Sequence, residues 1–544
     1  MTTKSALQQA RLYYHSKLPM ILRDLGHIAC VKGDATSSIA DADKLQALFP
    51  KTFGQPIIAL HHKEQRTKAH EKCIGVLFSG GQAAGGHNVI CGLFDAIKSF
   101  NPKSSLVGFV NGPKGVVDND IITITQELVD RYRNQGGFDM IGSSRTKIES
   151  EEQLKAALDT AIALDLDGIV IIGGDDSNTN AAVLAEFFRQ NSCKTCIIGV
   201  PKTIDGDLKN EQVELSFGFD TATRIYSELI GNIAQDCLSA KKYYHFIKVM
   251  GRSASHIALE CALQTHPNYT LIGEEVAAGG KGLKELVCDL SDLVVSRAEK
   301  GKNYGIVLIP EGLIEFIPEI GQLIRELNRI LTKEGIGDKS FNETKNSAVG
   351  ALSAESKEAF DALPPNIQEQ LLLDRDPHGN VKVAQIETEK LLIQLVREEL
   401  KVRKKKGSYK GSFHPLPHYF GYEGRAALPS NFDAQYCYAL GKTAAVLINA
   451  KATGYMSCLN NLAKPIENWQ AGGVPLTMMM NIEERHGKEK PVIKKALVNL
   501  NKEPFVTFAK QRQQWQNEDH YLSPGPIQFF GPDDITYTTT HTLG

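Results

Sequence analysis

Short apolar runs recur between residues 72 and 312, and each is followed by glycine or charged residues and then by a helical pattern. Seven runs have this form, at residues 74–78, 106–110, 168–172, 196–200, 245–250, 270–273 and 305–309. Each run is too short for a helix, and β-branched residues are common among them. The pattern therefore predicts buried parallel strands.

Helical spacing fills several of the intervals between these runs. Residues 151–164 carry apolar side chains at helical spacing, and residues 179–190, 221–239 and 253–264 are also predicted helices. Strands that alternate with helices form βαβ units, so the sequence predicts an α/β fold with a doubly wound, mostly parallel sheet.

The pattern is weaker outside this region. Residues 1–70 are predicted to form a mostly helical extension, and residues 317–331 and 386–406 read as amphipathic helices. The second of these ends in the basic run 403–406, which fits either a solvated helix end or a patch for nucleic acid or an acidic partner.

Composition narrows the class of protein. Among 544 residues, 61 Lys and Arg stand against 63 Asp and Glu, a formal charge of −2. That balance argues against bulk electrostatic binding of nucleic acid. No apolar run approaches the roughly 18 residues of a membrane span, and the start of the chain has no secretory pattern. We expect a cytoplasmic protein with neither a nucleic-acid nor a membrane partner.

The ten cysteines do not form a metal motif. Cys193 and Cys196 make the one Cys-x-x-Cys pair, and no second pair or pair of histidines completes a zinc site. We expect reduced thiols.

Polar and charged residues gather where the predicted strands end. In a doubly wound sheet, ligands bind just beyond the carboxyl ends of the strands, so chemistry is expected at these positions. Five segments stand there: residues 79–81, 173–177, 201–207, 250–252 and 310–312.

The first of these segments opens a glycine-rich stretch that contains Gly80, Gly81, Gly85 and Gly86. Glycines before a helix let backbone amides approach a phosphate closely, and the helix N-terminus adds positive potential. The spacing fits neither the dinucleotide motif nor the P-loop, so no nucleotide is specified. A structural tight turn explains these glycines equally well.

Asp175 and Asp176 are adjacent carboxylates after the run at 168–172. Such a pair needs compensation by a cation or by hydrogen-bond donors. Mg²⁺ binds through one or two carboxylates while it bridges phosphate oxygens. The structural alternative is that Asp176 or Ser177 caps the next helix.

Lys202, Asp205 and Asp207 follow the next run closely. A lysine between carboxylates suits a developing phosphoryl charge, and a well-placed aspartate can accept a proton from a hydroxyl. Arginines, which bind phosphate in a bidentate manner, follow glycines at Arg145, Arg252 and Arg425. These residue types predict phosphoryl transfer between phosphate-rich small molecules. Neither the serine-hydrolase elbow nor the zinc-protease helix motif is present.

Six segments occur in the order found in phosphofructokinases, and the chain resembles that family closely. They are residues 80–88, 173–177, 201–207, 250–252, 310–312 and 421–425. The length and the 70-residue lead-in are similar to those of the long, pyrophosphate-dependent 6-phosphofructokinases. The resemblance implies two doubly wound α/β domains of the phosphofructokinase type.

The resemblance also implies a reaction. Pyrophosphate and fructose 6-phosphate would give fructose 1,6-bisphosphate and phosphate, reversibly and with Mg²⁺, in glycolysis or gluconeogenesis. Asp205 would be the general base and Asp175 the metal ligand. Pyrophosphate would be bound by Gly81, Arg145, Asp176 and Lys202. The sugar phosphate would be bound by Thr203, Ile204, Asp205, Met250, Gly251, Arg252, Glu311, Tyr422, Glu423, Gly424 and Arg425.

Two further residues imply an assembly. In this family, contacts to the sugar phosphate also come from a neighbouring subunit, and Lys242 and Tyr243 are the candidates here. We therefore expect a homodimer or larger homo-oligomer with shared active sites.

Asp176 and Lys202 bear on the phosphoryl donor. ATP-using relatives carry glycine in place of Asp176, and a carboxylate there would crowd and repel the α-phosphate of a nucleotide. Lys202 would stabilise the transition state when phosphate leaves. The alternatives are an ATP-dependent sugar kinase of the same fold and a non-catalytic regulatory subunit of a hetero-oligomer, which should lack its base.

The predicted domains follow from these assignments. Residues 1–70 are the helical extension, and residues 71–240 bind the donor and Mg²⁺. Residues 241–450 bind the sugar phosphate and contain a helical insertion at about 317–410. Residues 451–544 form a C-terminal segment that packs back on the core.

Overall fold

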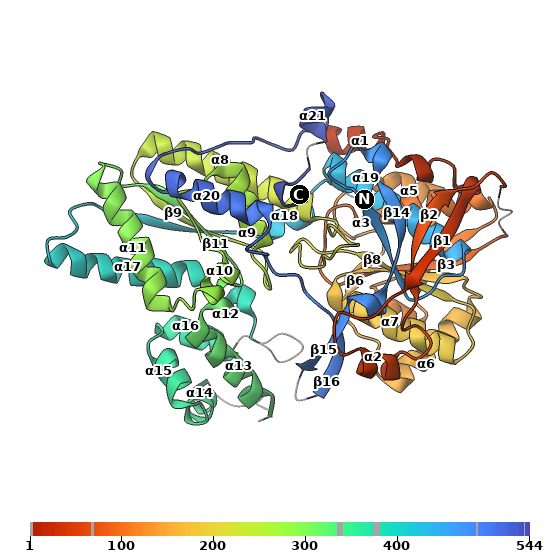
Figure 1. Ribbon diagram of the computed structural model, residues 1–544, viewed down its shortest axis with the longest axis horizontal. Coiled ribbons are helices and arrows are strands. Elements are labelled where there is room, and N and C mark those ends of the chain that lie inside the picture. The colour runs from red at the N-terminus through yellow and green to blue at the C-terminus, as the bar shows by residue number, and fades with distance from the viewer. Residues whose placement is uncertain are drawn as a thin grey trace. The chain divides into compact units, whose positions relative to one another are not determined.

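The computed structural model describes residues 4–66, 70–333, 341–373, 381–485, 488–537 and 539–543 (Figure 1). The chain forms two compact units. Unit 1 comprises Met1–Ala222, Tyr422–Ala496 and Ile527–Leu543, and unit 2 comprises Thr223–Gly421 and Leu497–Pro526. No helix in these described ranges is long and apolar enough to cross a membrane.

A ten-stranded sheet forms the centre of unit 1. Its parallel central strands match the predicted apolar runs: β3 (Cys73–Ser79), β4 (Ser105–Phe109), β7 (Gly168–Gly173) and β8 (Cys196–Pro201). The strand order is β1-β2-β14-β13-β8-β7-β3-β4-β5, and β6 (Ser143–Ser144) pairs with β3. Because β4 and β7 lie on opposite sides of β3, the order reverses there, and a ligand crevice is expected at that point.

Helices pack on this sheet as the alternating pattern predicts. α7 (Asp175–Gln190) packs on β7 and β8, with α6 (Glu151–Ala163) beside it. Ile169 and Ile171 of β7 belong to the same apolar cluster as α7, whereas the intervening residues point to the other face of the sheet. Burial on both faces explains why β7 is a continuous apolar run.

A second helical pair is formed by α3 (Gly86–Phe100) and α19 (Asn431–Asn449), which pack against each other. α19 also contacts β8 and β13 (Tyr455–Asn460). The short elements α4 (Pro113–Asp118), β5 (Ile121–Thr123) and α5 (Gln126–Tyr132) complete this part of the chain.

The prediction that residues 1–70 are mostly helical is wrong. β1 (Ile28–Ala35) and β2 (Pro56–His62) form an antiparallel pair that joins β14 (Gln470–Pro475). In Figure 1 these two red strands lie beside the blue β14, from the other end of the chain. Most of β1 is exposed, so it has no apolar run, and pairing rather than local pattern makes it a strand. The helices here are α1 (Ala6–Leu12) and α2 (Ala42–Leu48).

The predicted domain ranges also differ from the compact units. Unit 1 takes in the N-terminal segment and residues 422–496, and the predicted C-terminal segment 451–544 is divided between the two units. In that segment β13, β14 and the hairpin of β15 (Met480–Arg485) and β16 (Lys488–Ile493) belong to unit 1, whereas α20 (Glu503–Asn517) belongs to unit 2. The chain passes between the units several times, which sequence order does not reveal.

Unit 2 contains a four-stranded parallel sheet in the order β10-β11-β9-β12. β9 (Tyr244–Val249) and β11 (Gly305–Pro310) match predicted runs. The run at 270–273 yields only β10 (Tyr269–Thr270), because α10 (Gly273–Ala278) begins at its end. β12 (Pro415–Phe420) was not predicted, since it is an edge strand with two prolines and exposed side chains.

The helices of unit 2 agree with the predicted helical segments and the predicted insertion. α8 (Phe219–Ala240), whose first residues belong to unit 1, α9 (His256–Thr265) and α17 (Thr388–Lys405) match predicted segments. α11 (Leu283–Glu299) was not predicted. α12 (Leu313–Phe316) precedes the predicted insertion, which contains α13 (Pro318–Lys333), α14 (Phe341–Gly350), α15 (Ala354–Asp361) and α16 (Pro365–Leu373). Residues 334–340 and 374–380 of the predicted insertion lie outside the described residues.

A buried carboxylate caps the start of α8. Asp433 of α19 accepts hydrogen bonds from the backbone N–H groups of Gly218 and Thr221, at 3.0 and 2.9 Å, and from the Thr221 hydroxyl at 2.5 Å. Burial, and after it the nearby carboxylate of Asp220, raises the pKa of Asp433 to about 7. Ser430, the N-cap of α19, donates to Asp220 at 2.6 Å, so the two helix starts are capped together.

Replacing Asp433 should therefore destabilise unit 1 by an amount that depends on the substituent. Asp433→Ala leaves buried donors without an acceptor, which should cost about 2–4 kcal/mol of unfolding free energy. Asp433→Asn keeps an acceptor oxygen and removes a charge that burial disfavours, so its loss should be much smaller. Urea unfolding of both variants measures this, and equal losses would contradict the capping role.

Candidate active site

Loops of unit 1 meet beyond the carboxyl ends of β3, β7 and β8, and Lys202 joins two of them. Lys202 follows β8 directly, is buried, and donates from Nζ to the backbone oxygen of Gly81 at 2.6 Å. A Cβ at Gly80 would lie 3.5 Å from Lys202 Nζ, and a Cβ at Gly81 would lie 3.4 Å from a guanidinium nitrogen of Arg425. The first two glycines of the stretch thus lie against two cations.

The next two glycines serve packing. A Cβ at Gly85 would lie 2.5 Å from the Cys437 sulfur, and a Cβ at Gly86 would lie 2.2 Å from the ring of Phe138. Gly85 also has a φ of +104° as it starts α3. Both interpretations of this stretch therefore apply. The phosphate-binding one fits Gly80 and Gly81, and the structural one fits Gly85 and Gly86.

Charged side chains of opposite sign gather around Lys202. Burial lowers the pKa of Lys202 to about 8, the carboxylates of Asp205 and Asp175 oppose that shift, and the guanidinium groups of Arg145 and Arg425 reinforce it. Burial, with the charges of Asp205 and Asp175, raises the pKa of Asp207 to about 7. The structure thus brings together five residues singled out from the sequence: Arg145, Asp175, Lys202, Asp205 and Arg425.

Lys495, for which the sequence analysis gave no role, offsets part of this negative charge. Its Nζ lies 3.6 Å from Asp175 Oδ2 and 3.9 Å from Asp207 Oδ2. Asp207 is buried, while the Asp175 side chain keeps 19% of its surface exposed. Among the described residues, no group of three or more His, Cys, Asp or Glu side chains could hold a metal ion. One or two carboxylates suffice for Mg²⁺ when phosphate oxygens complete the coordination, so Asp175 fits that ion.

Asp175 and Asp176 occupy the first turn of α7, which begins four residues before its predicted start. The N-cap is Gly174, and no side chain caps this end, so the capping alternative for Asp176 and Ser177 is wrong. Ser177 instead donates to the hydroxyl of Ser79 at 2.7 Å. The Asp176 carboxylate is 45% exposed and lies 3.3 Å from Lys147 Nζ.

The loop after β8 is held by its own hydrogen bonds and by the segment before α8. The backbone N–H of Asp205 donates to the Thr203 hydroxyl oxygen at 3.0 Å, and Ser216 donates to the backbone oxygen of Thr203 at 3.2 Å. Phe217 bridges to Lys202, and its N–H donates to Pro201 at 3.1 Å. Ile204 is buried, whereas the neighbouring Asp205 is partly exposed.

A second group of predicted residues lies at the carboxyl ends of the strands of unit 2. The buried carboxylate of Glu311 accepts from the N–H of Gly251 at 2.8 Å, which ties the end of β11 to the end of β9. A Cβ at Gly421, after β12, would lie 2.9 Å from the Met250 methyl group. Arg252 is exposed at the same sheet edge. The structure thus brings these residues together.

Lys242 and Tyr243 do not lie with this group. Lys242 and Tyr243 precede β9, with the ammonium group 5.4 Å from the ring centre, and so lie at the opposite end of that strand from Gly251. Tyr422, Glu423, Gly424 and Arg425 form the short helix α18 (Tyr422–Arg425) of unit 1, in which the guanidinium carbon lies 4.6 Å from the centre of the Tyr422 ring.

Sequence reasoning missed two lysines, Lys147 and Lys495. Lys147 stands two residues after Arg145, a spacing that could have suggested a second cation on the same segment. Lys495 follows the hairpin of β15 and β16, about 290 residues after Asp207, and no local pattern connects it with the acidic residues.

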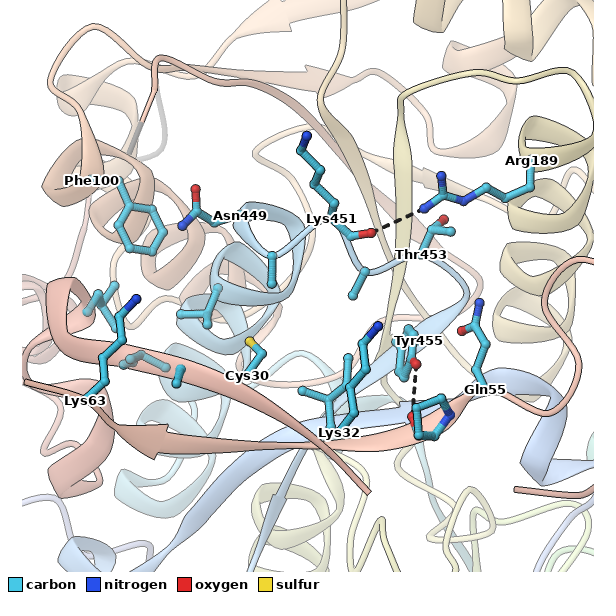
Figure 2. Close-up of a pocket in the computed structure, with 18 residues that line it drawn as sticks. Cys30, Lys32, Gln55, Lys63, Phe100, Arg189, Asn449, Lys451, Thr453 and Tyr455 are labelled. Carbon is cyan, nitrogen blue, oxygen red and sulfur yellow. Dashed lines mark hydrogen bonds between the residues drawn. The ribbon is translucent and has the colours of Figure 1, made fainter. Parts of the chain in front are cut away.

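A cavity of about 520 Å³ in unit 1 lies apart from these residues. Figure 2 shows Lys32, Lys63, Arg189 and Lys451 around it, and none of the predicted site residues lines it. The last residues of α3 and α19 and the last turn of α7 border this cavity. Cations next to the carbonyl ends of helices are favourable, so this basic lining has a structural explanation.

Comparison with known proteins agrees with this architecture. The phosphofructokinase family pattern matches residues 73–361. A pyrophosphate–fructose 6-phosphate 1-phosphotransferase of Porphyromonas gingivalis is 51% identical over 99% of this chain and 98% of its own length. The beta 1 subunit of the enzyme of that name in Arabidopsis thaliana is 52% identical over 99% of this chain and 94% of its own. A solved pyrophosphate-dependent phosphofructokinase of Nitrosospira multiformis is 17% identical, has a TM-score of 0.55, and is matched over 87% of this chain and 97% of its own.

The fold and site define an α/β protein whose charged loops lie at the reversal point of a doubly wound sheet. Relatives that are about half identical over nearly the whole length identify its family. The chain belongs to the phosphofructokinase family.

The lowered pKa of Lys202 predicts a pH dependence. The free protein should carry the ammonium charge below pH 8 and lose it as the pH rises through about 8. Calorimetric affinity for pyrophosphate should therefore fall across that range. Lys202→Arg should show no such fall, because a guanidinium keeps its proton there. Comparing the two proteins cancels the ionisation of pyrophosphate itself, and parallel curves would contradict the assignment.

Proposed function

We propose that this chain transfers a phosphoryl group from pyrophosphate to the 1-hydroxyl of fructose 6-phosphate, giving fructose 1,6-bisphosphate and phosphate. Both phosphoryl compounds have similar transfer energies, so the reaction should run in either direction. The observation that carries the proposal is that buried Lys202 and the partly exposed carboxylate of Asp176 both stand on the loops after β3, β7 and β8, which we call the donor loops. The chain is also about half identical to full-length relatives of that name.

The donor would be bound by Gly81, Arg145, Lys202 and the region in front of Asp176. Lys202 would stabilise the charge on the leaving phosphate, and Arg145 would contact the phosphate oxygens. Asp176 would repel a further phosphate and crowd the nucleoside attached to it, so pyrophosphate is favoured over a nucleotide as the donor. The negative charges of the carboxylates at this sheet edge support the exclusion of nucleotides.

Asp205 would accept the proton of the sugar hydroxyl as phosphoryl transfer proceeds. Its backbone is fixed by Thr203 and its side chain is partly exposed, as a base that meets a substrate requires. Mg²⁺, held by Asp175, would neutralise charge on the phosphate oxygens when bound. Lys495 already lies next to Asp175, which supports a need for positive charge at that point.

The family resemblance supports the remaining roles, which concern the sugar phosphate. Thr203, Ile204 and Asp205 would line its reacting end. Arg252 and Arg425 would bind its phosphate, with Glu311 holding Gly251. The remaining contacts would come from Met250, Tyr422, Glu423 and Gly424.

Lys242 and Tyr243 support a shared active site. β9 has six residues and so spans about 20 Å, with Lys242 before its start and Arg252 after its end. One chain therefore cannot bring both residues to the same phosphate through this strand. We propose that Lys242 and Tyr243 serve the site of a second copy, in a homodimer or larger homo-oligomer.

Two alternatives make different predictions. An ATP-dependent sugar kinase would phosphorylate fructose 6-phosphate with ATP and not with pyrophosphate. A regulatory subunit would be inactive by itself, although it would be unusual for one to keep Asp175, Asp205 and Asp207. Assaying the purified chain with each donor in turn tests the proposed function.

Removing the carboxylate at position 176 should weaken the choice of donor. Asp176→Gly should weaken the use of pyrophosphate and raise the activity with ATP. The gain with ATP is expected because the variant removes the repulsion of the α-phosphate, and one such charge is worth about one to several kcal/mol. Steady-state kinetics with both donors measures this. A variant with the donor preference of the parent would show that Asp176 does not select the donor.

Mixing two defective variants should restore activity if sites are shared. Asp205→Ser should lose several powers of ten in kcat, because the base acts in the transition state. Lys242→Ala should raise the KM for fructose 6-phosphate. In a mixed dimer one site is intact, so random reassociation should recover about a quarter of the wild-type activity at low sugar phosphate. No recovery, despite mixed assembly seen by native mass spectrometry, would contradict shared sites.

A further inference from the structure

Lys147 pairs with Asp176, and neither the sequence motifs nor the roles given above assign it a task. Its Nζ lies 3.3 Å from Asp176 Oδ1, with the lysine side chain 27% exposed and the aspartate side chain 45% exposed. Ion pairs between partly exposed groups are weak unless the backbone fixes both ends. The surroundings of Lys147 therefore decide whether this pair matters.

The backbone next to Lys147 is fastened to α7. The N–H of Ile148 donates to Asn180 Oδ1 at 3.2 Å, and the Asn180 amide donates back to the Ile148 oxygen at 2.7 Å. The Ile148 side chain is buried in the apolar cluster that also contains residues of α7. Asn180 and Asp176 are four residues apart on one helix, so they share a face. The bonds that hold residue 148 also hold Lys147 against Asp176.

The hairpin of β15 and β16 supports the same segment. Lys490 of β16 lies 3.1 Å from the carboxylate of Glu149, which lies 3.9 Å from Lys147 Nζ. The N–H of Ile493 donates to the Thr179 hydroxyl at 3.0 Å, which anchors the hairpin to α7. Charges of alternating sign thus run from Asp176 through Lys147 and Glu149 to Lys490.

A fixed cation at this place has a consequence for Asp176. The aspartate follows Asp175 directly, and two adjacent carboxylates repel each other. Loss of Lys147 would remove one of the interactions that keep the Asp176 side chain in its position next to Asp175. With Lys147 in place, its carboxylate is held in one position at the donor loops.

We propose that Lys147 is a positioning residue for the choice of phosphoryl donor. It holds the Asp176 carboxylate where that group excludes the α-phosphate of a nucleotide, and it acts through Asp176 without binding the donor itself. The inference rests on the proposed role of Asp176 and extends it to the residue that keeps the carboxylate in place.

The test is the ratio of kcat/KM for pyrophosphate to kcat/KM for ATP. Lys147→Met should lower this ratio about 3- to 5-fold, as expected for loss of a well-fixed, partly exposed ion pair. The KM for fructose 6-phosphate should not change, and Lys147→Arg should restore most of the ratio. Lys44→Met is the matched control, because it breaks an exposed pair with Glu489 on the same hairpin, at 2.6 Å, and should leave the ratio unchanged.

A double-mutant cycle with Asp176→Asn separates positioning from direct binding. In the Asp176→Asn background, Lys147→Met should change the donor ratio less than twofold. An equal loss in both backgrounds would make Lys147 a donor ligand and overturn the inference, as would an unchanged ratio in the parent background. If the parent protein did not use pyrophosphate at all, the proposed function itself would fail. Thermal unfolding of each variant identifies any general loss of structure.

Discussion

The need to compensate buried charge at the reversal point of the ten-stranded sheet is the constraint on which the rest of unit 1 depends. Asp175, Asp205 and Asp207 lie near buried Lys202. Burial lowers the pKa of Lys202 and raises that of Asp207, so it favours the neutral form of each. A protein interior tolerates such a group only when opposite charges and hydrogen bonds surround it. Here the balancing cations come from remote parts of the chain: Arg145 after β6, Arg425 in α18, and Lys495 after the hairpin.

This dependence explains why the chain returns to unit 1 after building unit 2. Residues 422–496 supply Arg425, α19, two strands of the sheet and the hairpin, and the segment ends with Lys495 and Ala496. Asp433 of the same segment caps the start of α8. The returning segment therefore completes the core and the electrostatic balance of the site together.

The sequence predicted the parts of the fold that local pattern determines. β3, β7, β8 and β11 are buried on both faces, so each contains an apolar run whose end can be recognised in the sequence. β9 is also buried, although it contains His245 and Lys248. β1 and β12 are edge strands without such runs, and long-range pairing alone defines them. The division into units could not be predicted either, because strand order is set by contacts between segments hundreds of residues apart.

The candidate site divides in the same way. Residues directly after apolar runs, such as Asp175, Lys202 and Asp205, were found because strand ends are where ligands bind. Lys495 was missed because its position depends on the hairpin, and Lys147 because an ion pair has no sequence pattern of its own. The glycine stretch was half understood, since only the folded chain separates Gly81, near cations, from Gly85, against Cys437.

β1 also affects the tendency of the protein to aggregate. It covers β2 at the border of the large sheet, and its own outer residues include Lys32 and Asp34, charges that discourage a further strand from adding. β2 contains the apolar segment Pro56–Leu60, which has no such protection. A chain shortened to begin after residue 35 would present that apolar edge to other molecules and should aggregate, even with every catalytic group intact.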